Sequence, residues 1–195
     1  MGGWLFFGII FGVVFGVVAL YNGLVSRRNL VGNSFSQIDV QLQRRHDLIP
    51  SLVKTARAYM MHEQETLTRV TEARQQAVGM QELLRAAPKN PAALEQLAAA
   101  ERVLSSSLSR LMAVVEQYPD LKADQLMQQL MEELSSTEDR IGFARQAYND
   151  HVMMYNNACQ MFPSNMIAGA FSFKPLKQLV LVDQDARQAP AVSFA

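Results

Sequence analysis

The sequence predicts an all-α protein: a single N-terminal transmembrane helix, then an elongated antiparallel bundle of long helices, then a partly irregular C-terminal tail. Residues 1–26 carry no charged side chain, although the 195-residue chain has 18 Lys and Arg and 18 Asp and Glu. Apolar residues recur at spacings of three and four over residues 35–159, as on one helix face. The apolar residues of 164–195 do not follow that period. The expected domains are an N-terminal segment over 1–26, a bundle over 27–163 and an apolar tail over 164–195.

The first element is a membrane anchor. Residues 4–20 are all apolar or glycine, and Trp4 and Tyr21 stand where interfacial aromatic residues are common. The alternative is a cleaved secretory signal, which needs a basic start and a small-residue cleavage motif. No Lys or Arg precedes the apolar stretch, and Ala19-Leu20-Tyr21 matches that motif poorly. We therefore expect a segment that crosses the lipid bilayer once and is not cleaved.

Basic residues after this segment predict its orientation. Arg27 and Arg28 follow it directly, and Arg44 and Arg45 come within the next 20 residues or so. Because positive residues stay on the cytoplasmic side, we expect the N-terminus outside and residues 27–195 in the cytoplasm. Residues 27–57 hold six Lys or Arg against two Asp. This basic stretch could face anionic lipids, or its arginines could pair with the more acidic helices of residues 90–163.

Three glycines in the anchor suggest contact with another helix. Gly8, Gly12 and Gly16 lie four residues apart and so share one face of a helix. Such a face allows another helix backbone to approach closely, which favours self-association. The alternative is that glycine is simply common in membrane helices.

The long helices follow in order. The pattern predicts one helix of about 45 to 50 residues from Phe35 onward, kinked but not ended by Pro50. Pro88 and Pro91 bracket the first expected turn, where Asn90 is a candidate N-cap with Pro91 at the first helical position. A second helix is expected up to Pro119, and a third from Asp124 to the proline at 163. Short connections predict antiparallel packing. The tail is expected to be either disordered or docked, on its own bundle or on a neighbouring subunit.

Composition excludes several classes of protein. One cysteine excludes an intramolecular disulfide, and balanced charge argues against a nucleic-acid partner. The sequence contains no zincin motif, phosphate-binding glycine loop or nucleophile elbow, so no catalytic residue, metal site or cofactor is expected.

Two polar groups of residues stand out within the helical pattern. The first is Gln37, Asp39, Gln41, Arg44, Arg45 and Asp47; the second is Tyr148-Asn149, repeated seven residues later as Tyr155-Asn156. Their side chains can donate and accept hydrogen bonds between helices. They are expected to fix the register of facing helices, or alternatively to form a ligand or docking site.

These residues also carry a family resemblance. The chain resembles the LemA family of bacterial membrane proteins over nearly its whole length. The matching stretches include Tyr21-Asn-Gly-Leu-Val25, residues 36–45, Asp47-Leu-Ile-Pro50, residues 116–122, Tyr148-Asn149 and Phe162-Pro-Ser-Asn165. Phe35 and Ser51 depart from the usual tryptophan and asparagine. The resemblance implies a single-pass anchor with its N-terminus outside and a cytoplasmic bundle, and it supplies no catalytic residue.

The sequence thus predicts a non-enzymatic, membrane-anchored scaffold at the bacterial inner membrane. It would form a homo-oligomer and shape the membrane or organise partners. The alternative is an adaptor that regulates an unidentified membrane partner, such as a sensor kinase, a protease or a component of the envelope-stress response.

Overall fold

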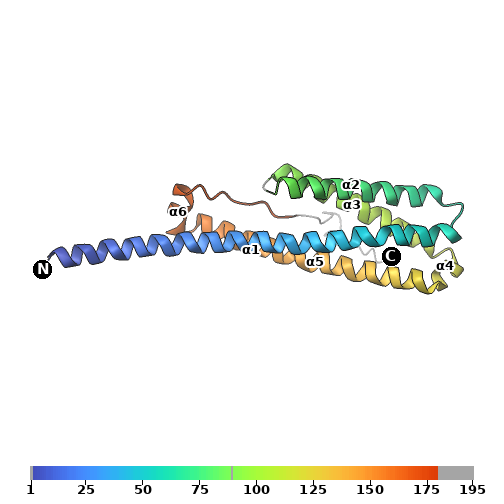
Figure 1. Ribbon diagram of the computed structural model, residues 1–195, viewed down its shortest axis with the longest axis horizontal. Coiled ribbons are helices and arrows are strands. Elements are labelled where there is room, and N and C mark those ends of the chain that lie inside the picture. Colours follow the sequence, from blue (N-terminus) through green and yellow to red (C-terminus); the bar gives the residue numbers. More distant parts are fainter. Residues whose placement is uncertain (1, 89, 180–195) are drawn as a thin grey trace, which may run out of the picture. The chain divides into compact units, whose positions relative to one another are not determined.

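The computed structural model describes residues 2–88 and 90–179, and all regular structure in these ranges is helical (Figure 1). The all-α prediction is therefore confirmed. The part of the expected tail from residue 180 onward lies outside the described residues. The helices are α1 (Gly2–Tyr59), α2 (Gln64–Ala86), α3 (Pro91–Val115), α4 (Pro119–Ala123), α5 (Gln125–Gln160) and α6 (Ser164–Ala170).

The first helix differs from the expected one at both ends. α1 runs for 58 residues without interruption from the apolar segment through Pro50 to Tyr59. A single helix from Phe35 past residue 70 was the wrong prediction, because the chain turns at residues 60–63 and α2 begins at Gln64. Met60 is fully buried at this turn, and its backbone N–H donates to the carbonyl of Ala56 at 2.9 Å.

The second expected helix begins where the sequence indicates. The Asn90 side chain accepts a hydrogen bond from the Ala92 N–H at 3.0 Å, and Pro91 occupies the first helical position of α3. Both features satisfy or remove backbone donors that a helix start leaves without partners. The prediction of this N-cap is confirmed.

The last helices begin and end close to the expected residues. Pro119 starts the short α4, and Asp124 caps α5 by accepting from the Met127 N–H at 2.9 Å. The tail expected over 164–195 was predicted to be partly irregular, and its first residues form the short α6. Ser172, with φ of 57°, follows α6, and residues 173–179 form neither helix nor strand but run as an extended segment (Figure 1).

The chain divides into two compact units. Of the described residues, unit 1 comprises 2–45 and 133–178, and unit 2 comprises 46–88, 90–132 and 179. Within unit 1, α1 and α5 are antiparallel: Leu24 packs with Ala158, whereas Phe35 contacts Tyr148 with ring centroids 5.9 Å apart. As the residue number increases along α1, the residue number of its contact on α5 decreases, so the two helices run in opposite directions.

Unit 2 has an apolar core supplied by several helices. Burying side chains of this kind contributes about 1.5–3 kcal/mol each for the larger ones. The contributing residues include Ile49, Leu52 and Ala56 of α1, Leu67, Val70, Ala77 and Leu84 of α2, and Leu97, Leu104, Leu108 and Leu111 of α3.

Candidate functional site

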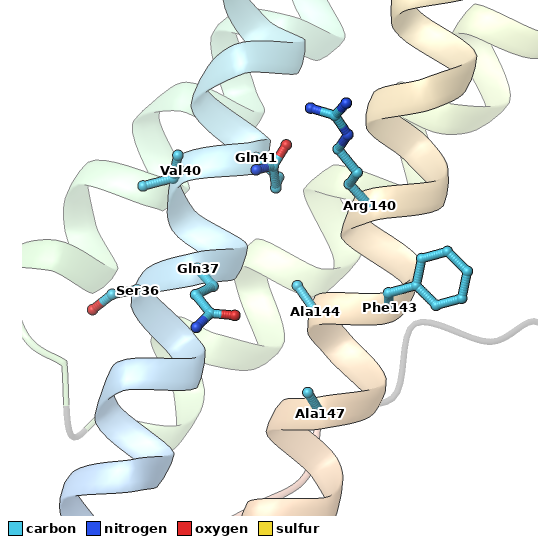
Figure 2. A pocket seen from close by; sticks show the side chains of 8 residues that line it. All are labelled: Ser36, Gln37, Val40, Gln41, Arg140, Phe143, Ala144 and Ala147. Atoms are coloured by element: carbon cyan, nitrogen blue, oxygen red, sulfur yellow. The ribbon is translucent and has the colours of Figure 1, made fainter.

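A groove lies between α1 and α5 in unit 1. It has a volume of about 680 Å³. Figure 2 shows Gln37 and Gln41 extending from α1 toward α5, with Arg140 opposite Gln41. The lining residues are Ser36, Gln37, Val40, Gln41, Arg140, Phe143, Ala144 and Ala147.

The polar groups of this groove are suited to binding. The Oε1 atom of Gln41 is buried and accepts no hydrogen bond in the structure. A buried acceptor without a partner costs stability, which a bound donor would recover. Arg140 adds a guanidinium cation whose donors can bind an acidic group. The lining thus offers an amide acceptor and a guanidinium donor, which suit recognition of a partner's polar groups.

The arginines of the first polar group bind acidic residues of α5. Arg44 Nη2 lies 3.2 Å from Glu133 Oε1, with both side chains about half exposed. Arg45 pairs with Glu138, and its own side chain is only 2% exposed. Burial lowers the pKa of the Arg45 guanidinium, while the Glu138 carboxylate opposes that shift. Asp39 and Asp47 also have interaction partners. Of the two alternatives for Arg44 and Arg45, the structure thus contains ion pairs with a later helix, α5.

The second polar group has a partner that the sequence pattern did not indicate. Tyr155 donates from its hydroxyl to the Lys174 carbonyl at 3.1 Å, and Tyr148 donates to the Lys177 carbonyl at 3.2 Å. Asn156 binds both backbone groups of Leu176, donating to its carbonyl and accepting from its N–H, each at 2.9 Å. These side chains hold the extended tail segment, where a facing helix was expected. Asn149 has an interaction partner as well.

Burial affects the two tyrosines of this group. It raises the pKa of Tyr148, and it raises the pKa of Tyr155 to about 12 together with a hydrogen bond to Cys159. Arg28 lies near enough for its charge to oppose the shift at Tyr155. Both hydroxyls therefore stay protonated donors at neutral pH.

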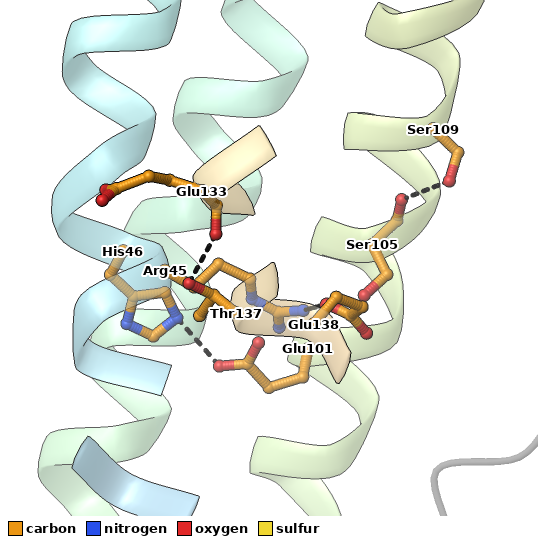
Figure 3. Close-up of polar contacts among 8 residues, drawn as sticks. All are labelled: Arg45, His46, Glu101, Ser105, Ser109, Glu133, Thr137 and Glu138. Carbon is orange, nitrogen blue, oxygen red and sulfur yellow. Dashed lines mark hydrogen bonds and ion pairs between the residues drawn. The ribbon is translucent and has the colours of Figure 1, made fainter. Parts of the chain in front are cut away.

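A buried pair in unit 2 escaped the sequence analysis. His46 Nε2 lies 2.9 Å from Glu101 Oε1, and His46 Nδ1 lies 3.1 Å from Gln81 Oε1. The three residues are no more than 2% exposed. Arg74 donates to the His46 carbonyl at 2.6 Å. Figure 3 shows the His46–Glu101 contact of unit 2 and, separately, the Arg45–Glu138 pair of unit 1. The sequence signal that could have revealed this pair is Glu101, which occupies a position of the α3 heptad pattern where leucine is usual.

The anchor residues lie on an exposed part of α1. A window of this helix has a mean hydropathy of 2.1 and is only 6% buried, so by length and composition it could cross a membrane. An added Cβ at Gly8, Gly12 or Gly16 would meet no atom within 4 Å. Arg27 and Arg28 are exposed, and Arg27 Nη1 donates to the Gly23 carbonyl at 3.3 Å.

The chain is similar in sequence to several known proteins. The chain is 26% identical over 169 residues to the magnetosome protein MamQ of Magnetospirillum gryphiswaldense, a match that covers 79% of the chain and 62% of that protein. It is 29% identical over 173 residues to the magnetosome protein MamQ 2 of Paramagnetospirillum magneticum, with the same coverage. It is 28% identical over 147 residues to the protein LemA of Metamycoplasma hominis, covering 75% of the chain and 63% of that protein.

The chain thus spans less than two thirds of the length of these relatives. The profile of the LemA family matches residues 34–194, which is most of the chain and includes the groove, the arginine pairs and the tyrosine–asparagine group. This protein belongs to the LemA family.

Proposed function

We propose that this protein is a non-enzymatic, membrane-anchored scaffold that forms a homo-oligomer at the bacterial inner membrane. The observation that carries the proposal is the continuity of α1 from its apolar window into both units. Since one helix holds the anchor and part of each core, a helix contact made in the membrane would be transmitted to the bundle. The absence of enzymatic activity is part of the proposal.

The exposed apolar window and the glycine face support membrane insertion and self-association. A bilayer would cover the exposed side chains of residues 6–18. Arg27 and Arg28, which directly follow the charge-free residues 1–26, support an orientation with the N-terminus outside. The open space around the three glycines leaves room for a second α1.

Gly12→Ile is expected to abolish self-association of the protein. A Cβ added at residue 12 has no neighbouring atom within 4 Å, so the effect of the substitution is expected to come from blocking the approach of a second helix. Light scattering of the detergent-solubilised protein and a dimerisation assay in membranes would measure the change.

Val14→Ile is the matched control, because residue 14 lies on the other side of α1 from Gly12. It should leave association unchanged. A wild-type protein that is monomeric in both assays, or equal association in the two variants, would refute the glycine contact.

The groove supports a second candidate function, an adaptor that binds a membrane partner. Its buried acceptor on Gln41 and the cation of Arg140 would suit a partner that offers a donor and an acidic group. The scaffold remains the first proposal because it draws on the whole of α1.

A photocrosslinking amino acid at Gln37, inside the groove, is expected to give one discrete product in native membranes if the adaptor proposal is correct. The same group at Gln146, which is exposed on α5 and does not line the groove, should not give it. A product with the mass of two copies of this chain would favour the scaffold, and identical products at both positions would contradict a specific site.

A further inference from the structure

Exposed apolar side chains gather at the turn from α5 to α6. Met161, Phe162, Met166 and Phe171 are 64%, 79%, 65% and 55% exposed. Residues 152–173, which include this turn, carry no charged side chain. A charge-free cluster of exposed apolar residues marks an interaction surface more often than a solvated one. We call residues 160–173 the α5–α6 turn.

The α5–α6 turn lies beside the end of the apolar segment of α1. The ring of Tyr21 is 4.9 Å from that of Phe171 and 5.6 Å from that of Phe173, centroid to centroid. Leu24 forms a buried cluster with Ala158 and Ala168. Tyr21 and Leu24 belong to the charge-free residues 1–26, so the turn lies at the level where α1 would leave a membrane.

Charged residues mark the other limit of this level. Arg28 is close enough to influence Tyr155 electrostatically, and the Tyr155 hydroxyl binds the backbone of Lys174. Moving along the α1 axis away from its apolar segment, the first charged residues of α1 and of the segment after α6 are therefore both met close to Tyr155. On the membrane side of Arg27, residues 2–26 of α1 are uncharged, and so are the end of α5 from Val152 onward and all of α6.

We propose that the α5–α6 turn is a second membrane contact, in which Met161, Phe162, Met166 and Phe171 enter the interfacial layer of the bilayer that α1 crosses. This inference rests on the proposed membrane anchor. The seven residues of α6 are too few to cross a bilayer, so the segment lies in the interface. Its exposed uncharged polar residues, such as Gln160 and Asn165, suit the headgroup region.

A second contact would change how unit 1 is held at the membrane. One helix alone leaves a domain free to rotate about the helix axis. Because the α5–α6 turn lies on one side of α1, its insertion would fix which face of α1 and α5 points toward the membrane plane. The lipid bilayer is the expected occupant of this surface, since the surface continues the apolar window of α1.

Tryptophan fluorescence in nanodiscs tests this proposal. Trp4 is the only tryptophan, so Trp4→Phe gives a background in which Phe162→Trp reports on the turn alone. Its emission is expected to be quenched by lipids with a nitroxide near the headgroup, and less by lipids with a nitroxide near the end of the acyl chain. Phe143→Trp is the matched control: Phe143 is 74% exposed on the same helix, about 25 Å from its end. It should keep its emission with both lipids.

The outcomes separate this inference from the anchor. Quenching of Trp4 in the wild-type protein shows the anchor in lipid, and unquenched Trp4 overturns both the anchor and the turn contact. If Trp4 is quenched while Trp at 162 behaves like Trp at 143, the anchor stands and the second contact is overturned. If Trp at 162 escapes nitroxide quenching but is also shielded from a soluble quencher, protein covers the turn, which likewise overturns the proposal.

Discussion

Replacing Glu101 with alanine is expected to lower the free energy of unfolding of unit 2 by about 3–5 kcal/mol. The Glu101 carboxylate lies 2.9 Å from a His46 ring that is fully buried. Removal of the carboxylate leaves a buried N–H of His46 without its acceptor and leaves a space in the core of α3. Denaturant titration, monitored by hydrogen exchange of peptides from α2 and α3, would measure the loss of free energy of unfolding.

Two variants test whether the buried contact is the cause. Glu82→Ala removes an exposed carboxylate from α2 and should change the stability of unit 2 by no more than about 0.5 kcal/mol. Glu101→Gln keeps an oxygen that can accept from His46, so its loss should be smaller than that of Glu101→Ala. Equal losses for Glu101→Ala and Glu82→Ala would show that the His46 contact does not stabilise the core.

Much of the fold could be predicted from local chemistry. Asn90 and Pro91 start α3 because a side-chain acceptor and a missing N–H suit the first turn of a helix, and neither needs tertiary context. The turn at residues 60–63 could not be predicted in the same way. It contains no Gly or Pro, and the apolar spacing continues across it; what distinguishes it is Met60, whose burial in unit 2 is a tertiary feature.

The polar groups show where sequence reasoning ended. Residues such as Arg45 and Tyr155 could be identified as bonding residues from their type and spacing alone. Their partners could not, because Glu138 and the Lys174 carbonyl lie 93 and 19 residues away along the chain. The family resemblance had the same limit, since it identifies matching positions and says nothing about which of them touch.

Asn156→Ala is expected to release the extended tail segment from α5. The side chain makes two hydrogen bonds with the backbone of Leu176. At about 1 kcal/mol for each, their loss would raise the fraction of time that the segment is detached by roughly 30-fold. Limited trypsin digestion reads this out at one bond. Trypsin does not cut before proline, so Lys174-Pro175 is protected chemically and the cut would fall after Lys177.

The neighbouring Asn157 provides the control for this effect. Asn157 is exposed, so Asn157→Ala removes an amide from the same turn of α5 without touching Leu176. Cleavage after Lys177 should then keep its wild-type rate. Tyr155→Phe, which removes one hydrogen bond to Lys174, should fall between the two. If all three variants are cut after Lys177 at the wild-type rate, the side chains of Tyr155 and Asn156 do not hold the tail. The graded order would instead show that this repeated pair serves the tail, because a role confined to helix register would leave the bond after Lys177 protected.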